Sequence, residues 1–202
     1  MLYELNVNLD NRSYPIKIGY DLLMEAGKIL FKEGLKGNCL VIADNNTSIF
    51  YDELKSSLDS NNINSTLTVV DPGENSKSLE QLKKLYSNCI KAKLDRHSFI
   101  IALGGGVIGD LAGYVSATYL RGINFIQIPT TLLAMVDSAV GGKTGVNLDE
   151  GKNLVGAFHQ PRLVLSDLKT LNSLPDREFI AGMAEVIKYG IIYDKSFFNK
   201  IE

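Results

Sequence analysis

The chain has 202 residues, of which 45% are apolar and 22% are charged, and its formal net charge is −2. This length and apolar fraction suffice for one or two domains with a buried core, and the near-neutral charge argues against a nucleic-acid-binding surface. No apolar run reaches the roughly 18 residues of a membrane span, and the N-terminus lacks a signal-peptide pattern, which favours a cytoplasmic location. Cys39 and Cys89 are far apart in sequence, so we expect both to be reduced and buried.

Strand-like and helix-like patterns alternate along most of the chain. Strands are predicted near residues 5–9, 16–18, 39–43, 65–70, 99–103 and 124–128. Helices are predicted from about 21 to the break at Gly34, and over 49–58, 78–93 and 107–119. Strands separated by helices of this length are typical of an α/β, Rossmann-like fold, with a mainly parallel sheet covered by helices on both faces.

A glycine-rich turn follows the strand at 99–103, in the sequence FIIALGGGVIGD. A strand that ends in glycines at the start of a helix is suited to a diphosphate, because bare backbone and free N–H groups are accessible there. The simpler alternative is a tight turn, with Asp110 stabilised by the helix dipole. Three consecutive glycines, Gly104–Gly106, exceed what a turn needs, so the phosphate interpretation is favoured.

Polar residues follow four of the predicted strands. They are Asp44 and Asn46, then Glu74 and Lys77, then Gly104–Asp110, and finally Thr130 and Thr131. The carboxyl ends of parallel strands form a ligand-binding edge, so these residues are expected to surround a nucleotide. For Asp44 or Thr130 taken alone, ordinary capping is the better interpretation.

The pattern changes after Thr131. Asp137 lies among apolar residues at a spacing that predicts the inner side of a helix, where a carboxylate must be paired or functional. The run Gly141–Thr144 resembles part of a phosphate loop but is not a Walker A sequence. Lys143 and Lys152 flank a short strand-like element at 144–147, and Asn153 follows the second lysine. Around the glycine bends these residues could hold an anionic substrate, unless the lysines are simply solvated.

A helix is predicted from Ser173 or Pro175 to Gly190. Glu178, Glu185 and Lys188 share one of its faces, so Glu185 is either a surface partner of Lys188 or a metal ligand. A catalytic zinc site needs about three protein ligands, and neither histidine has ligand spacing to Glu185. The chain alone therefore does not predict a complete metal site.

Four segments in this order resemble the 3-dehydroquinate synthase family of sugar phosphate cyclases: GGGVIGDLAGYVSATYLRGI, IPTTLLAMVDSAVGGKTGVN, GKNLVGAFHQP and FIAGMAEVIKYG. PGENSKS is similar to the family's upstream cofactor segment. Other sugar phosphate cyclases share the glycine turn and the helix that bears Glu185, whereas iron-dependent alcohol dehydrogenases and glycerol dehydrogenase are remoter relatives in fold.

The resemblance implies a lyase of the shikimate pathway, which makes aromatic amino acid precursors, with NAD and a divalent metal (zinc or cobalt) as cofactors. Its substrate would be 3-deoxy-D-arabino-heptulosonate 7-phosphate, and its products 3-dehydroquinate and phosphate. A ring hydroxyl is oxidised, phosphate leaves by β-elimination, the ketone is reduced again, and the ring opens and recloses. NAD is thus regenerated within one turnover.

The family's functional residues map onto this sequence as follows. Cofactor contacts fall on Asp44, Asn46, Pro72, Gly73, Glu74, Lys77, Gly105, Gly106, Val107, Ile108, Gly109, Asp110, Thr130, Thr131, Lys143, Lys152, Thr170, Leu171, Asn172 and Ser173. Catalytic or substrate-facing positions are Asp137, Lys143, Lys152, Asn153, Lys188 and Arg121, the last reaching the partner subunit of a homodimer. Glu185 would be one metal ligand.

The family's chains are considerably longer, and their other metal ligands are histidines in a helical C-terminal domain. We therefore expect residues 1–174 to form an NAD-binding α/β domain and 175–202 to begin the helical domain, in a fragment that binds NAD weakly, exposes a docking surface and lacks turnover. The alternatives are a metal-dependent polyol or alcohol dehydrogenase, another sugar phosphate cyclase, or a non-catalytic nucleotide-binding fragment. A dehydrogenase would accumulate NADH, whereas a cyclase would not.

Overall fold

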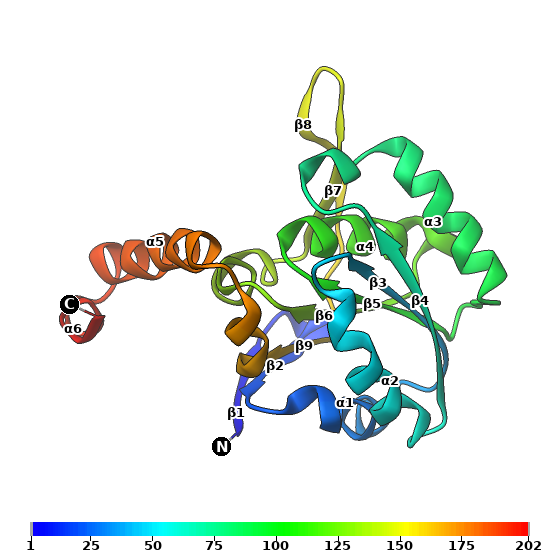
Figure 1. Cartoon of the computed structure of the whole chain (residues 1–202), viewed down its shortest axis with the longest axis horizontal. Helices are drawn as coiled ribbons and strands as arrows, with labels where there is room; N and C mark the ends of the chain where they lie inside the picture. Colours follow the sequence, from blue (N-terminus) through cyan, green and yellow to red (C-terminus); the bar gives the residue numbers. More distant parts are fainter. Residues whose placement is uncertain (1, 202) are drawn as a thin grey trace.

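A computed structural model describes residues 2–201 and has a seven-stranded sheet at its centre (Figure 1). Its strands are β1 (Leu2–Val7), β2 (Tyr14–Gly19), β3 (Gly37–Asp44), β4 (Ile63–Val70), β5 (Phe99–Gly104), β6 (Asn124–Pro129) and β9 (Leu163–Asp167). Their order across the sheet is β1-β2-β9-β6-β5-β3-β4. Only β1 pairs antiparallel in this sheet, so the predicted mainly parallel α/β fold is confirmed.

Two helices cover each face of the sheet. The four helices are α1 (Leu22–Lys32), α2 (Tyr51–Asp59), α3 (Leu79–Lys91) and α4 (Gly106–Thr118). Alternate residues of a strand point to opposite faces, so Val41 packs with the leucines of α1 and α2, while Leu40 and Ile42 pack with α3 and α4. Cys39 and Cys89 are buried and free, as expected.

The helices begin in two different ways. Ser78 caps α3 by accepting a hydrogen bond from the Gln81 N–H at 3.2 Å, as its sequence position predicts. α1 begins near the expected Asp21, but the Asp21 side chain makes no cap. Instead the buried carboxylate of Asp167, at the end of β9, accepts from the N–H groups of Asp21 at 3.1 Å and Leu23 at 3.0 Å. A cap supplied from so far along the chain leaves no local sequence signal.

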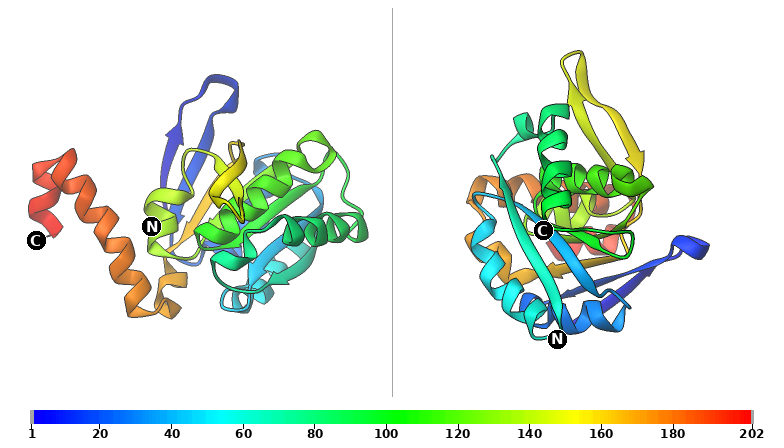
Figure 2. Two further views of the ribbon diagram at one scale, coloured as in Figure 1. Left: turned by 90° about the horizontal axis from the view of Figure 1, so that it is seen from above. Right: turned by 90° about the vertical axis from the view of Figure 1, so that its right-hand side faces the viewer.

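A two-stranded hairpin stands away from the sheet, formed by β7 (Lys143–Leu148) and β8 (Gly151–Phe158) (Figures 1 and 2). Only part of β7 was predicted, and β8 and β9 were missed. Most of β8 is exposed, so it lacks an apolar alternation, and β9 has only five residues. The hairpin packs on α4, where a Cβ on Gly113 would lie 2.3 Å from Thr144 Cγ2.

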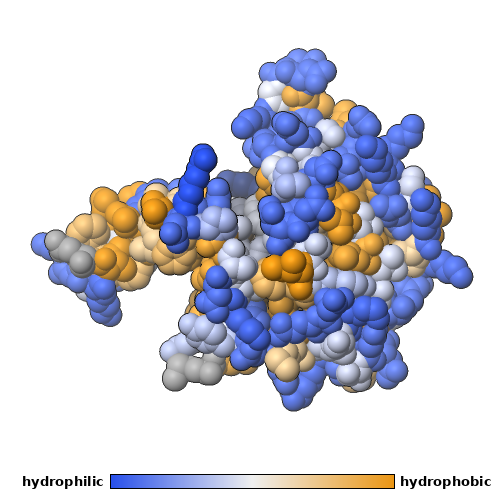
Figure 3. Space-filling model, viewed as in Figure 1, coloured by the Kyte–Doolittle hydropathy of each residue, from blue (hydrophilic) through white to orange (hydrophobic). Residues whose placement is uncertain are grey.

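The C-terminal helices project from the body of the molecule (Figure 2, left). They are α5 (Asp176–Ile192) and α6 (Lys195–Ile201), so a helix does follow residue 175. α5 packs at Gly182 against Leu132 and Leu133. Its outer part exposes Ile180, Ile192 and Tyr193, and hydrophobic surface is visible there in Figure 3. No helix of residues 2–201 is long and apolar enough to cross a membrane.

Six short helical segments join these elements. They are η1 (Asp10–Arg12), η2 (Ser48–Phe50), η3 (Glu74–Ser76), η4 (Tyr119–Arg121), the π-helix η5 (Ala134–Ser138) and η6 (Leu168–Ser173). Of these, η3 and η5 carry residues that line the candidate site.

Candidate nucleotide and substrate site

A groove of about 840 Å³ lies at the carboxyl ends of β3, β4, β5 and β6. The residues predicted to contact a cofactor that do line it are Asp44, Asn46, Pro72, Gly73, Glu74, Lys77, Gly105, Gly106, Val107, Ile108, Asp110, Thr130, Thr131 and Ser173. These residues come from several separate strand ends, and the parallel sheet brings them to one edge.

The first turn of α4 faces this groove. The first N–H groups of any α-helix have no intrahelical acceptor. In α4 they are also uncapped, because Gly105 at the N-cap position has no side chain. A Cβ on Gly105 would lie 3.1 Å from Thr131 Cγ2, and one on Gly106 would lie 2.9 Å from Ser138 Oγ. Side chains at these two positions would crowd Thr131 and Ser138, so the glycines leave the backbone of the first turn uncovered where it lines the groove. Gly104 is the last residue of β5, where Ile108 leaves no space for a Cβ, so close packing also accounts for one of the three glycines.

Asp44, Thr131 and Thr130 differ in the hydrogen bonds that their side chains make. Asp44 Oδ1 accepts from the N–H groups of Asn46 and Thr47, both at 2.9 Å, so the capping interpretation holds for Asp44. Thr131 Oγ1 accepts from the Ala134 N–H at 3.1 Å. Thr130 Oγ1 is buried and has no partner within residues 2–201, although it lines the groove. An unpaired buried hydroxyl at this edge fits a bound polar ligand.

Six predicted cofactor contacts do not line the groove, and two of them, Lys143 and Lys152, are described below with the substrate residues. Gly109 is buried in α4, where a Cβ would lie 2.7 Å from Gln127 Oε1, so the glycine serves helix–sheet packing. Thr170 is buried in η6 and donates to the Asp167 carbonyl at 2.8 Å. Leu171 and Asn172 belong to the same segment, of which only Ser173 reaches the groove. The family resemblance pointed to all four residues of this segment, whereas only Ser173 faces the groove.

A charged cluster closes one end of the groove. The buried Lys77 donates through Nζ to Asp110 Oδ2 and to Asn153 Oδ1, both at 2.6 Å. Glu74 lies 3.6 Å from the same Nζ. Burial raises the pKa of Asp110, and the Lys77 ammonium opposes this increase. In contrast, a hydrogen bond from Asn147 and the nearby lysines hold the pKa of Glu74 below its ordinary value.

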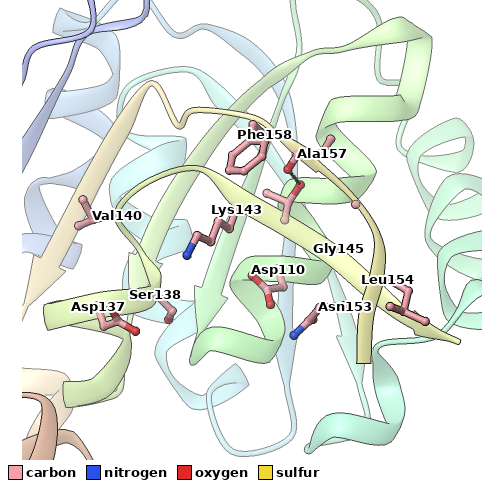
Figure 4. A pocket seen from close by; sticks show the side chains of 12 residues that line it. Asp110, Asp137, Ser138, Val140, Lys143, Gly145, Asn153, Leu154, Ala157 and Phe158 are labelled. Carbon is pink, nitrogen blue, oxygen red and sulfur yellow. Dashed lines mark hydrogen bonds between the residues drawn. The ribbon is translucent and has the colours of Figure 1, made fainter. Parts of the chain in front are cut away.

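A second cavity of about 490 Å³ lies between α4, η5 and the hairpin. Asp110, Asp137, Lys143 and Asn153 line it, and Figure 4 shows these side chains grouped around one space. Asp110 also lines the groove, so the two cavities are adjacent. Three of the predicted substrate-facing residues are therefore brought together beside the nucleotide groove.

The prediction that Asp137 lies on the inner side of a helix is wrong. Asp137 is exposed and belongs to η5, a π-helix of five residues. A π-helix has a different side-chain period from an α-helix, so the apolar spacing around Asp137 gave the wrong face. Asp137 Oδ1 accepts from Tyr189 Oη at 3.2 Å, so it faces α5 as well as the cavity.

The other predicted substrate residues lie outside both cavities. Lys152 is exposed on β8, near enough to Glu74 to help lower the pKa of that carboxylate. Lys188 is exposed on α5. Arg121 is exposed in η4, at the opposite end of α4 from the groove, so it does not approach the groove of its own chain. That position is compatible with the expected reach towards a partner subunit.

Glu185 pairs with Lys188 on α5, which is one of the two alternatives left open by the sequence. No cluster of three or more histidine, cysteine, aspartate or glutamate side chains within residues 2–201 could hold a metal ion. His159 lies instead beside the Ile123 carbonyl, with Nε2 at 3.0 Å. The donor set described here therefore does not fit a divalent metal by itself.

Sequence reasoning missed several residues that line or support the site. Ser138 and Glu178 line the groove, Tyr189 contacts Asp137, and Asn147 contacts Glu74 at 2.8 Å. Asn147 could have been found from its position after a lysine and a glycine bend, but only the folded hairpin brings it against Glu74.

The chain was compared with known protein families and sequences. The family model described as 3-dehydroquinate synthase N-terminal matches residues 67–181. The 3-dehydroquinate synthase of Symbiobacterium thermophilum is 50% identical over 198 residues, which cover 97% of this chain and 55% of the relative. That of Prochlorococcus marinus is 48% identical over 202 residues, or 98% of this chain and 55% of the relative. The chain thus spans about half the length of these relatives.

Solved structures agree with the sequence comparison. A 2-deoxy-scyllo-inosose synthase complexed with carbaglucose-6-phosphate, NAD+ and Co2+ is 29% identical, with a TM-score of 0.84, covering 92% of this chain and 50% of that one. The 2-epi-5-epi-valiolone synthase of Streptomyces hygroscopicus, with NAD+ and Zn2+ bound, is also 29% identical, with a TM-score of 0.83 over 94% and 52%. An iron-containing alcohol dehydrogenase from Thermotoga maritima, 19% identical with a TM-score of 0.71 over 87% and 52%, shares the fold alone. Since the family model covers more than half of its length, this chain belongs to the 3-dehydroquinate synthase family.

Proposed function

We propose that the groove binds NAD, with the diphosphate at the first turn of α4. The uncapped helix N-terminus at Gly105 and Gly106 carries this proposal, because it offers free N–H groups, a positive dipole and no obstructing side chain. The unpaired hydroxyl of Thr130 supports it as a further polar contact.

The carboxylates at the groove suit the remaining parts of a dinucleotide. Asp44 and Glu74 would accept hydrogen bonds from ribose hydroxyls, and Lys77 would hold Glu74 and Asp110 in place from its buried position. When bound, NAD would supply reversible hydride transfer. The pKa of Glu74 is held below its ordinary value by the Asn147 hydrogen bond and the nearby lysines, so this acceptor stays ionised further into the acid range.

We further propose that the cavity beside the groove takes a sugar phosphate, 3-deoxy-D-arabino-heptulosonate 7-phosphate, which the complete synthase converts to 3-dehydroquinate and phosphate. Lys143 supplies a cation and Asn153 an amide at the cavity wall, while Asp137 faces the same space. Lys152 and Lys188 would approach from the hairpin and α5. In this proposal, residues 1–174 are the NAD-binding domain, 175–202 begin the helical domain, and the enzyme works in the cytoplasm.

Two parts of the proposed active site need groups beyond the described residues. A zinc or cobalt ion at Glu185 would require further ligands, because the part of the chain that the structure describes holds no cluster of three candidate ligands. Arg121 would complete the phosphate site of the partner subunit in a homodimer, since it lies far from the groove of its own chain. Accordingly, we propose that this chain alone has no turnover.

A metal-dependent polyol or alcohol dehydrogenase is not favoured. The iron-containing alcohol dehydrogenase is only 19% identical to this chain, whereas the 3-dehydroquinate synthase of Symbiobacterium thermophilum is 50% identical to it. The chemistry also separates the two classes, because a dehydrogenase accumulates NADH and a cyclase regenerates NAD.

Calorimetric titration of the chain with NAD tests the proposal. We expect measurable binding, about tenfold weaker binding by Gly105→Ala, and no detectable binding by Gly105→Val, because each added carbon narrows the space beside Thr131. Thermal unfolding of each variant controls for loss of the fold. Equal NAD affinity in all three proteins, or no binding by the unsubstituted folded chain, would refute the groove as the NAD site.

A further inference from the structure

The hairpin contains an irregularity at Asn147. Val146 pairs with Val155 and Leu148 pairs with Gly151, so the register shifts between Val146 and Leu148. Bulges of this kind redirect a side chain out of the regular alternation and are common beside functional sites. The extra residues lie on β8, where 152–154 face the single Asn147 of β7, and Asn147 Nδ2 contacts Glu74 at the nucleotide groove.

Asn147 contacts three residues through three different groups. Its backbone N–H donates to the Lys77 carbonyl at 2.7 Å. Its Nδ2 donates to Glu74 Oε1 at 2.8 Å, and its Oδ1 accepts from the Asn153 backbone N–H at 2.8 Å. The side chain thus uses both ends of its amide to join a residue of the groove to a residue of the adjacent cavity.

The contact with Asn153 constrains an unusual backbone conformation. Asn153 has φ of +56°, in the left-handed region that non-glycine residues rarely adopt. Its side-chain Oδ1 accepts from Lys77 Nζ at 2.6 Å, so the position of that amide depends on this backbone conformation. A single acceptor on Asn147 therefore holds the backbone that aims the Asn153 side chain.

We propose that Asn147 is a positioning residue that fixes Glu74 and Asn153 relative to each other, and so aligns the nucleotide groove with the substrate cavity. The inference rests on the proposed function, because it assigns roles to the groove and the cavity. A regular hairpin would not need this arrangement, since ladder hydrogen bonds already pair β7 with β8.

The charges around Glu74 show what loss of the amide would do. Lys77, Lys152 and Asp110 are the charged groups that interact with Glu74, and the Asn147 hydrogen bond is the largest influence lowering its pKa. Replacing the donor by a carboxylate would turn this attraction into repulsion, so Glu74 would protonate at higher pH. Asn147→Asp keeps an acceptor for the Asn153 N–H, while Asn147→Ala removes both contacts.

Amide hydrogen exchange followed by NMR tests the contact with Asn153 without any cofactor. We expect the Asn153 N–H to be protected in the unsubstituted chain and in Asn147→Asp, but at least tenfold faster to exchange in Asn147→Ala. The ladder amides of Thr144 and Val155, which lie at hydrogen-bonded positions of the hairpin, should stay protected in all three. Unchanged exchange at Asn153, or loss of protection along the whole hairpin, would overturn the positioning role.

Fluorescence titration with NADH tests the contact with Glu74. We expect about tenfold weaker binding by Asn147→Ala and a larger loss by Asn147→Asp, at an unchanged melting temperature. In Asn147→Asp the acid-side loss of affinity should begin at higher pH than in the unsubstituted chain. The matched control is Asn64→Ala, which removes an exposed amide bonded to Asn38 at the opposite edge of the sheet, and should leave affinity unchanged.

The two measurements separate the possible failures. If the unsubstituted chain bound no NADH, the proposed function would fail, and Asn153 exchange would still decide whether Asn147 positions the hairpin. If NADH bound equally to Asn147→Ala and Asn64→Ala, the positioning role would fail while the proposed function stood.

Discussion

The carboxyl edge of the sheet and the projecting helix α5 carry the two halves of the candidate site in contrasting ways. The sheet edge gathers residues from four strand ends into one groove, with an uncapped helix N-terminus and a hydrogen-bonded charged cluster. α5 carries Glu185 and Lys188, which pair with each other, on a helix whose outer part is apolar and exposed (Figure 3).

The difference teaches that a nucleotide site and a metal site make different demands on a chain. A dinucleotide groove can be built by one sheet, because backbone N–H groups and strand-end side chains supply most contacts. A metal centre needs several convergent side chains, and within residues 2–201 no three candidate ligands cluster, while Glu185 pairs with Lys188. The free energy of unfolding and the affinity for NAD are therefore expected to depend on the sheet and helices α1–α4, and little on α5.

The largest expected effect is a loss of stability on replacing Asp167. Its buried carboxylate accepts from the N–H groups of Asp21, Leu23 and Lys169, which ties α1 to the end of β9. Asp167→Ala should lower the free energy of unfolding by about 3 kcal/mol, because three backbone donors, that of Leu23 buried, lose a charged acceptor. Urea unfolding measures this. The exposed Asp149→Ala is the control, and an equal effect of both would contradict the assignment.

A smaller effect on stability is expected from Asp95 at acidic pH. Hydrogen bonds from Ser98 and His97 lower the pKa of Asp95 in the loop before β5. A carboxylate with a lowered folded-state pKa stabilises the fold above its unfolded pKa of about 4, and this contribution disappears as pH falls through the folded-state value. Thermal unfolding against pH should thus show a shallower acid-side decline for Asp95→Asn. The affinity of Asp95→Asn for NADH at neutral pH should not change, since Asp95 lies at the opposite edge of the sheet from the groove. A loss of NADH affinity in this variant would contradict the separation of the two edges.

Removing α5 and α6 tests directly whether the fold and NADH binding depend on these two helices. A chain that stops after Leu174 should melt within a few degrees of the full chain and bind NADH within about threefold, because the sheet, α1–α4 and most of the groove remain. The change also removes exposed Ile180, Ile192 and Tyr193, so we expect less self-association by light scattering. Loss of NADH binding with an intact fold would mean that α5, through Glu178, is part of the nucleotide site.

The smallest effect is expected from metal. Adding zinc, or removing metal with a chelator, should leave the melting temperature and NADH affinity of this chain unchanged, since residues 2–201 hold no cluster of three candidate ligands. Differential scanning fluorimetry measures the first quantity and fluorescence titration the second. A zinc-dependent rise in melting temperature that Glu185→Gln abolished would show that α5 binds metal without further groups.

The sequence by itself determined the alternation of strands and helices, the glycine turn before α4, and most residues of the groove. These features depend on local periodicity and on the rule that parallel strands end at one edge, so spacing along the chain was sufficient. The sequence could not place Asp137, because a π-helix changed the side-chain period, and it could not identify β8, whose exposed residues lack a pattern.

Only the tertiary structure decided which side chains meet. Asp167 accepts from the N–H of Asp21, 146 residues earlier in the chain, at the start of α1, and the folded hairpin brings the Asn147 amide to Glu74, 73 residues away in sequence. Contacts of this kind arise from packing between distant segments and leave no periodic trace, which is why they appear only once the chain has folded.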